Sequence, residues 1–447
     1  MAGIAGILKP GEHDRVSGML DKIIHRGNYS SKIVEFPDAT IGIVWSFHEN
    51  ERVSRSLETN MFIDGPGHGH LAFAAFSDGT WSLGRDELGV APMYYTYLGD
   101  DSLCFASEVK ALVPCSPDIS ELLPGCLLNH DGPASQYELT RHTTLDHPPE
   151  LIASDLLHLL SISVGRRINT DPIGSWLSGG LDSSTIAALA KPWVKSLHTF
   201  CGGVKDSPDL EFAREVAGFI GSTHHEVVIT VADMIKVLPR LIYHLESFDA
   251  WLVRSSIVNF LVAQYASDHV RDVFSGEGGD ELFAGYSYLK NLPEDSLEDE
   301  LVDITKRLHN TALQRVDRCA SAFGATAHVV FADPEVVEYA IKVPVRYKLH
   351  DGVEKWILRK AVEGILPDRI VKRGKAKFWE GAGVGELLAE FTERMVTDKD
   401  FRQERKLENG WILNTKEELY YYRLFREAFG QVHHLDWMGR SKGSPKT

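Results

Sequence analysis

The segment at 178–184 constrains the fold of this chain more than any other. It reads Ser178-Gly179-Gly180-Leu181-Asp182-Ser183-Ser184, and it joins an apolar run at 173–177, typical of a buried strand, to a run at 185–191 that predicts a helix. Backbone N–H groups and the positive end of the helix dipole make such a turn an anion site, and glycine lets the backbone approach a phosphate closely. The segment therefore predicts a phosphate site at a strand end.

Asp182 indicates that a cation accompanies the phosphates. A carboxylate beside a phosphate is repelled unless a cation lies between them, and Mg²⁺ is the cation that both groups share. The turn has no lysine and lacks the spacing of a Walker loop. It resembles instead the pyrophosphate loop of enzymes that split ATP into AMP and pyrophosphate. The alternative is an ordinary Ser/Gly turn before a helix.

The composition excludes several classes of function. The 447 residues suffice for two or three domains, and a net charge of −16 argues against nucleic acid as a partner. We find no signal peptide and no apolar run that could span a membrane, so we expect a cytoplasmic protein. The five cysteines are scattered without Cys-x-x-Cys pairs, which argues against a disulfide framework or a zinc site.

The pattern of predicted elements divides the chain in two. The first 140 or so residues read as short strands between turns, including runs at 41–46, 71–76, 93–97 and 103–106. A polar segment with prolines at 142–150 is a plausible linker. Strands and helices then alternate, which predicts a parallel sheet with helices on both faces and a ligand at the carboxyl ends of its strands. From about residue 301 the chain reads as mostly helical.

The order of short motifs resembles the asparagine synthetase superfamily, which includes the β-lactam synthetases. The motifs are Gly3-Ile4-Ala5-Gly6, His25-Arg26-Gly27, Gly84-Arg85-Asp86-Glu87-Leu88-Gly89, Ser107-Glu108-Val109-Lys110, the 178–184 loop, Ser275-Gly276-Glu277-Gly278-Gly279-Asp280-Glu281, Glu354-Lys355-Trp356-Ile357-Leu358-Arg359 and Arg373-Gly374-Lys375. The resemblance implies an α+β sandwich of the N-terminal-nucleophile (Ntn) glutaminase type over 1–143. It implies an α/β PP-loop ATP pyrophosphatase domain (adenine nucleotide α-hydrolase-like) over 150–447, with a helical C-terminal part.

The resemblance also implies a reaction in which ATP adenylates a carboxylate and an amine then displaces AMP. Asp182 and Asp280 would hold Mg²⁺, Lys375 would stabilise negative charge, and Glu277 would be the general base for the amine. Alternatively, Glu277 and Asp280 cap the helix that begins near them, and Lys375 is a solvated charge. The ATP-binding residues implied are Leu177, Ser178, Gly179, Gly180, Leu181, Asp182, Ser183, Ser184, Gly202 and Gly276.

The N-terminal part departs from the glutamine-dependent members of the family. These begin Met-Cys, and the cysteine is the nucleophile, whereas this chain has Ala2. The family's glutamine-binding motifs are also missing between Gly42 and Gly69. We therefore expect an inert scaffold, in which surviving motifs such as 84–89 serve core and interface packing.

The expected substrate site also differs from the pattern of the family. Where the family has two threonines, this chain has Trp251 and Leu252, and Arg254 follows. We predict that Trp251 contacts the substrate, that Arg254 clamps a carboxylate, and that Glu380 recognises an ammonium. Losing hydroxyls from a hydrogen-bonding site can reject the original substrate strongly.

These departures favour a synthetase that uses an amine within its own substrate, a small amino-acid-like molecule. The specific prediction is a β-lactam synthetase of antibiotic or toxin biosynthesis with ATP and Mg²⁺ as cofactors, although known β-lactam synthetases have tyrosine where Glu277 stands. The alternatives are an ammonia-dependent asparagine synthetase, an intermolecular amide ligase or macrocycle cyclase, and a non-catalytic nucleotide-binding scaffold. Family members are often dimers, so the resemblance leaves a homodimer open.

Overall fold

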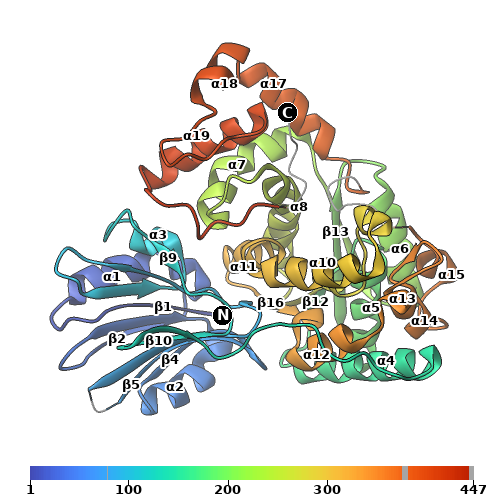
Figure 1. Ribbon diagram of the computed structural model, residues 1–447, viewed down its shortest axis with the longest axis horizontal. Helices are drawn as coiled ribbons and strands as arrows, with labels where there is room; N and C mark the ends of the chain where they lie inside the picture. The colour runs from blue at the N-terminus through green and yellow to red at the C-terminus, as the bar shows by residue number, and fades with distance from the viewer. Residues whose placement is uncertain (78, 375–380, 442–447) are drawn as a thin grey trace.

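The computed structural model describes residues 1–77, 79–374 and 381–441, and Figure 1 shows a β-rich N-terminal domain beside a larger α/β domain. Lys375 and Glu380, two of the predicted site residues, lie outside the described ranges. None of the helices in these ranges combines the length and the apolar character that crossing a membrane requires.

The N-terminal domain is a sandwich of two antiparallel sheets. Alternation along β5, where every second side chain from His70 is buried, gives each sheet one face for the shared core. Ile4, Ile43, Phe62 and Phe105 meet in that core. One sheet has the order β2 (Ser30–Glu35), β3 (Thr40–Trp45), β1 (Ala2–Ile7), β8 (Leu103–Ala106), β7 (Tyr94–Tyr97), β9 (Ser120–Glu121); the other has β11 (Gly132–Ser135), β10 (Cys126–Asn129), β6 (Thr80–Arg85), β5 (His70–Ser77), β4 (Met61–Gly67).

Helices that the sequence reading missed cover the sandwich. Helix α1 (His13–Lys22) buries Val16, Met19 and Leu20, and the domain also contains α2 (Asn50–Glu58) and α3 (Val109–Leu112). Helix α1 packs on β3, where Gly42 makes room for Leu20: a Cβ on that glycine would lie 2.6 Å from Leu20 Cδ1. The predicted α+β sandwich is confirmed, and its helical part exceeds the expectation.

The second domain is built on the parallel sheet that the alternating pattern predicts. The strand order is β14 (Thr223–Val228), β13 (Leu197–Gly203), β12 (Ile173–Trp176), β15 (Asp272–Ser275), β16 (Thr326–Val329). Helices α5 (Leu181–Ala190) and α6 (Pro208–Ile220) cover one face, and α8 (Ala250–Ala266) and α11 (Ala312–Ser321) cover the other (Figure 1). The strand order reverses between β12 and β15, so their carboxyl ends form a topological switch point.

The remaining helices surround this sheet, and the region after residue 301 is mostly helical, as expected. In chain order they are α4 (Pro149–Arg166), α7 (Val231–Leu245), α9 (Gly279–Leu282), α10 (Glu294–Lys306), α12 (Pro334–Lys342), α13 (Val345–Lys348), α14 (Trp356–Ala361), α15 (Asp368–Val371), α17 (Gly385–Met395), α18 (Asp398–Glu404) and α19 (Lys416–Phe429), with a hairpin of β17 (Leu349–His350) and β18 (Val353–Glu354).

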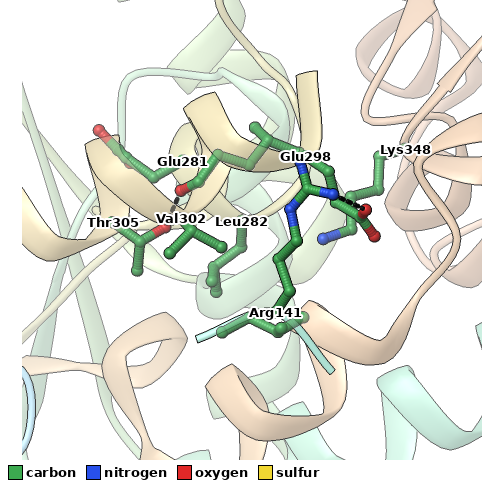
Figure 2. Close-up of a pocket in the computed structure, with 9 residues that line it drawn as sticks. Arg141, Glu281, Leu282, Glu298, Val302, Thr305 and Lys348 are labelled. Carbon is green, nitrogen blue, oxygen red and sulfur yellow. Dashed lines mark hydrogen bonds and ion pairs between the residues drawn. The ribbon is translucent and has the colours of Figure 1, made fainter. Parts of the chain in front are cut away.

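Helix α13 ends at a buried lysine, Lys348, beside residues of α9 and α10. Figure 2 shows Lys348 beside a small pocket with Glu281, Glu298 and Arg141, whose guanidinium lies 3.2 Å from Glu298. Lys348 is 3% exposed and makes no ion pair with any residue in the described ranges. Burial lowers the pKa of the Lys348 ammonium to about 7, although Glu298 partly opposes the shift. Burial and the nearby Asp280 raise the pKa of Glu281 to about 7.

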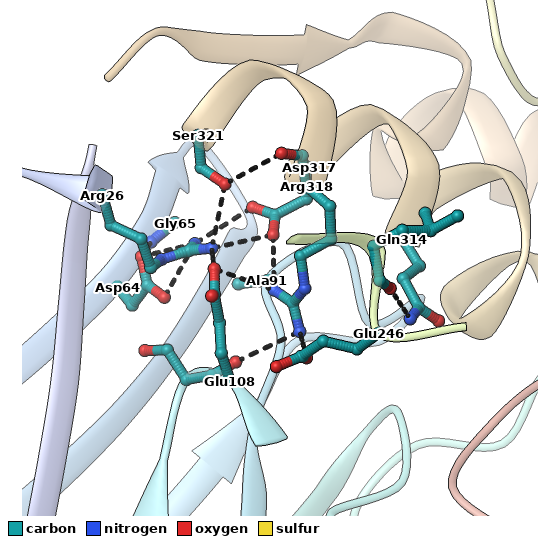
Figure 3. A network of polar contacts seen from close by, with 12 residues as sticks. Arg26, Asp64, Gly65, Ala91, Glu108, Glu246, Gln314, Asp317, Arg318 and Ser321 are labelled. Atoms are coloured by element: carbon teal, nitrogen blue, oxygen red, sulfur yellow. Dashed lines mark hydrogen bonds and ion pairs between the residues drawn. The ribbon is translucent and has the colours of Figure 1, made fainter. Parts of the chain in front are cut away.

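The two domains meet across a buried network of charges (Figure 3). The Arg26 guanidinium, which is fully buried, lies 3.0 Å from Asp64, 2.8 Å from Glu108 and 2.8 Å from Asp317 of α11. Arg318 continues the network to Glu246 at 2.9 Å. Burial alone would lower the pKa of Arg26, but the carboxylates of Asp317, Asp64 and Glu108 outweigh it and raise the pKa well above its usual value.

Two of the motifs that carry the family resemblance in the N-terminal part contribute residues to this network. Arg26 belongs to His25-Arg26-Gly27, and Glu108 and Lys110 belong to the motif that begins at Ser107. Lys110 lies 3.0 Å from Glu246, which joins the domains at a second point. Because a buried charge is stable only when it is paired, these residues fix how the sandwich sits on the synthetase-like domain.

We predict that Arg26→Met lowers the free energy of unfolding by about 3–5 kcal/mol, because it leaves buried carboxylates without their cation. Arg55 forms an exposed i,i+4 pair with Glu51, so Arg55→Met should change it by less than about 0.5 kcal/mol. Urea unfolding of both variants measures this. Similar losses in the two variants would contradict the structural role of the network.

We predict that Lys348→Met stabilises the protein by about 2 kcal/mol or more at pH 7. The folded-state pKa lies below the unfolded one, so the wild type gains stability as the pH rises from about 7 towards 10.5, and the advantage of the variant shrinks. Urea unfolding at pH 7 and 9.5 tests this. Lys372→Met, at an exposed position, should show no such trend.

Candidate nucleotide and substrate site

A cavity of about 710 Å³ opens at the carboxyl ends of β12, β13 and β15. This is the place that the switch-point rule predicts for a ligand. Predicted residues that line it are Leu177, Ser178, Gly180, Leu181, Asp182, Ser183, Gly202, Trp251, Gly276, Glu277 and Asp280. Residues that come from far apart in the sequence therefore surround one volume.

The 178–184 turn is shaped by its own serines. The Ser178 N–H donates to Ser183 Oγ at 3.2 Å, and the Gly180 N–H donates to Ser178 Oγ at 3.3 Å. Gly180 stands at the N-cap of α5 and has no side chain to accept from the first N–H groups of the helix. These N–H groups are therefore available to an anion in the cavity.

Two of the predicted ATP-binding residues do not line the cavity. Gly179 has φ +67°, and a Cβ there would lie 2.4 Å from Phe212 Cβ, so this glycine is required by the turn and by the packing of α6. Ser184 is fully buried within α5. The prediction that Ser184 binds ATP is therefore wrong, because Ser184 lies within the first turn of α5 and points into the protein.

A second glycine-rich turn, 275–280, packs against the first. A Cβ on Gly276 would lie 2.7 Å from the backbone nitrogen of Ser183, and one on Gly279 would lie 2.6 Å from Asp182 Cγ. Only glycine allows this approach, which brings the Asp182 and Asp280 side chains together. The N-cap of α9 is Gly278 and the helix has no side-chain cap, so the alternative that Glu277 and Asp280 serve as caps is wrong.

Lys355 joins the two carboxylates. Its Nζ lies 2.5 Å from Asp182 Oδ2 and 2.5 Å from Asp280 Oδ1, and the residue is 2% exposed. A left-handed backbone (φ +56°) at the start of α14 places it there, and its N–H donates to Phe283 O at 3.1 Å. A Cβ on Gly285 would lie 2.0 Å from Asp280 and 2.3 Å from Lys355 Cε, so a third glycine gives this cluster its space.

The donor set fits Mg²⁺. Two carboxylates that already converge on one cationic atom offer the hard oxygen ligands that this ion prefers. Asp182 and Asp280 are therefore the residues that would hold Mg²⁺.

Arginines complete the phosphate side of the cavity. Arg373 donates to Ser178 O at 3.0 Å and to Asp209 at 2.6 Å, and its guanidinium lies 4.0 Å from the centre of the Phe212 ring. Arg359 holds the backbone just before residue 375 by donating to the carbonyls of Val371 and Arg373. The predicted roles of Lys375 and Glu380 stay predictions, because both lie outside the described residues.

Glu277 is held at the cavity wall by an ion pair. Its carboxylate lies 2.6 Å from the Arg315 guanidinium of α11, which is itself nearly buried. The geometry fixes the position of one oxygen and leaves the residue lining the cavity. A proton acceptor at this position is compatible with the predicted role of general base.

The structure corrects the predicted role of Arg254. Its guanidinium donates through Nε to Glu417 of α19 at 2.8 Å, with a second contact through Nη2. Arg254 is not among the described residues that line the cavity, whereas Trp251, one turn earlier in α8, is. The partner Glu417 lies 163 positions away in the sequence, so a local motif could not reveal it. Among the described residues, the cations that line the cavity are Arg307, Arg315, Lys355, Arg359, Arg373 and Arg440.

Comparisons with known proteins agree with this geometry. The family model described as asparagine synthase matches residues 155–300 and 290–442. The chain belongs to the asparagine synthase family. A glutamine amidotransferase domain model matches residues 67–128, within the sandwich.

Related members of the asparagine synthase family include three proteins named glutamine-hydrolysing asparagine synthetases. The chain is 33% identical to number 2 of Lotus japonicus over 79% of its own length and 65% of the relative's, and 33% identical to synthetase B of Escherichia coli over 81% and 70%. The Zea mays protein is 34% identical over 79% and 65%. The chain thus spans about two thirds of the length of these relatives.

The structure adds Lys355 to the site, a residue for which the sequence predicted no role. Lys355 belongs to the motif at 354–359, which the sequence did single out. Nothing in that motif indicates which of its basic residues pairs with Asp182 and Asp280. Leu177, one of the predicted ATP-binding residues, donates its N–H to Phe200 O at 2.9 Å, and both residues line the cavity together with Gly202.

We predict that Gly279→Ala lowers pyrophosphate release from ATP at least about tenfold, since its Cβ would displace the Asp182 carboxylate. Gly218→Ala is a matched control, because a Cβ there meets no atom within 4 Å. Circular dichroism would confirm that both variants fold. Full activity of Gly279→Ala would contradict the tight packing of the two turns.

We predict that Mg²⁺ raises the melting temperature of a Lys355→Met variant more than that of the wild type. Removing the ammonium takes away the cation that Lys355 places between Asp182 and Asp280, so the ion binds the folded variant in its place. Thermal unfolding with and without MgCl₂, with NaCl at matched ionic strength, measures the shift. Equal shifts in the two proteins would show that the ion does not use these carboxylates.

Proposed function

We propose that this member of the asparagine synthase family is an AMP-forming amide synthetase that closes an amide within its own substrate, most specifically a β-lactam, and takes no ammonia from glutamine. One observation carries the proposal. Ala2 is fully buried in the sandwich core, and its carbonyl accepts from Arg26, whose other donors are taken by Asp64, Glu108 and Asp317. Neither a nucleophile nor an open site is present at this position, so the sandwich serves as a scaffold.

The residues of the cavity support adenylation. The N–H groups at the start of α5 would bind phosphate oxygens, and Arg373 would hold the phosphate side of the turn in place. Mg²⁺, when bound by Asp182 and Asp280, would neutralise phosphate charge. A substrate carboxylate oxygen attacks the α-phosphorus and pyrophosphate leaves, which gives an acyl adenylate.

The second step forms the amide. The amine nitrogen attacks the acyl carbon, the bond from that carbon to the adenylate oxygen breaks, and AMP leaves with the oxygen. Glu277, held by Arg315, would accept the proton that the nitrogen loses. When carboxylate and amine belong to one bound molecule, their high effective concentration helps to close a strained ring.

The substrate end of the cavity supports a substrate other than aspartate. Trp251 and Leu252 line it with apolar surface, and Arg254 is committed to Glu417. An apolar wall packs against methylene groups between the two reacting ends and offers few hydrogen bonds to a free α-carboxylate.

An ammonia-dependent asparagine synthetase is the second candidate. It is favoured by the 33% identity to proteins named asparagine synthetases and by Glu277 at the position of the expected base. In this case the amine would come from solution, and the same cavity would adenylate aspartate.

The test supplies ATP and Mg²⁺ with diamino or β-amino dicarboxylic acids, or with aspartate plus ammonium or glutamine, and measures pyrophosphate and product mass. We expect turnover without added amine and a product lighter by one water. Asp182→Asn serves as the inactive control. Turnover with aspartate and ammonium alone would overturn intramolecular closure and support the second candidate.

A further inference from the structure

We propose that His198, His225 and His269 form a binding site for one Zn²⁺ ion on the α8 face of the parallel sheet. One ligand atom from each of the three lies within 4.8 Å of the others, and His198 Nδ1 lies 3.0 Å from His225 Nε2. The site is separate from the predicted Mg²⁺ site, and none of its residues belongs to the nucleotide motifs. The scattered cysteines argued against zinc bound by thiolates, but that argument does not extend to histidines.

The sheet register brings these rings together. Phe200 of β13 pairs with His225 of β14, and His198 lies two residues before Phe200, so all three side chains lie on the same face. Helix α8 packs on this face, where a Cβ on Gly202 would lie 2.4 Å from Val262. His269 follows the end of α8, and its ring centre lies 4.5 Å from that of His225, with the two rings tilted by 32°. The arrangement thus joins two strands and a helix end.

The rings are oriented before any metal binds. His225 stacks on Phe200 with centroids 4.8 Å apart and an interplanar angle of 12°, and it is stacked with His198 at 5.2 Å. Tyr265 packs against His269 at 5.0 Å. These neighbours restrict how far each ring can turn, which limits the freedom lost on binding and favours affinity.

The geometry and chemistry suit zinc. Nitrogen ligands around tetrahedral Zn²⁺ lie about 3.4 Å from one another, so small rotations of the rings would place three nitrogens around one ion. All three histidines are partly exposed, which leaves the fourth position to water. Neutral imidazole nitrogens are common ligands of Zn²⁺.

Nitrogen ligands also separate this site from the nucleotide's cation. Mg²⁺ prefers oxygen ligands and dehydrates reluctantly, so millimolar Mg²⁺ should not compete for imidazoles. A bound Zn²⁺ would tie the end of α8 to β13 and β14, next to the Phe200 wall of the cavity.

The test uses the tag-free full chain, stripped with a chelator and titrated with Zn²⁺ against a chromophoric indicator, with MgCl₂ present. We expect one equivalent per chain, and at least about tenfold weaker binding in His225→Asn. His224→Asn is the matched control: His224 is the neighbour in β14, lies on the opposite face and contacts Thr199 at 3.0 Å. Its binding should equal that of the wild type.

Visible absorption of the Co²⁺-loaded protein gives an independent readout, since tetrahedral coordination by nitrogen yields intense bands that His225→Asn should lose. His269→Asn, in the segment after α8, replaces that variant if it does not fold by circular dichroism. Absence of stoichiometric Zn²⁺ from the wild type, or equal affinity in the histidine variants and the His224→Asn control, would overturn the proposal.

Discussion

The ion pairs of Lys355 with Asp182 and Asp280 are the interaction on which the functional site depends. The two aspartates lie in the first turns of α5 and α9, the helices that follow the adjacent strands β12 and β15, so the topology of the sheet brings both to the same edge. Carboxylates this close repel each other unless a cation lies between them, and Lys355 supplies one. Glycines at 276, 279 and 285 follow from the same constraint, because no larger residue leaves room for the cluster.

The charged network around Arg26 holds the two domains together by buried ion pairs. It uses residues of motifs that the family shares, yet here every donor of the guanidinium meets a carboxylate or a carbonyl. A sandwich held in this way can be a rigid support for the second domain without performing chemistry of its own. The sandwich keeps the fold of the family, whereas the proposed function rests on the buried Ala2 in its core.

Local patterns in the sequence predicted the parts of the structure that are themselves local. The sequence predicted the strand, turn and helix around 178–184 and the alternation of strands and helices that builds the parallel sheet. Hydrophobic periodicity and turn residues determine both. Partners far apart in the sequence were not. The sequence predicted Arg254 as a substrate clamp, but its partner in the structure is Glu417. Nothing in the sequence indicated that Lys355 pairs with the aspartates. The three histidines of the proposed zinc site are brought together by strand register, which a local pattern does not reveal.

The proposed reaction transfers AMP to a substrate carboxylate, so the fate of the carboxylate oxygen is its sharpest test. Mass spectrometry would be applied to the AMP formed from ATP, Mg²⁺ and a turned-over acid labelled with oxygen-18 in its carboxylate. We expect AMP that carries one labelled oxygen, together with pyrophosphate. Unlabelled AMP, or ADP with labelled phosphate, would contradict it, because the carboxylate would then have been activated in another way or not at all.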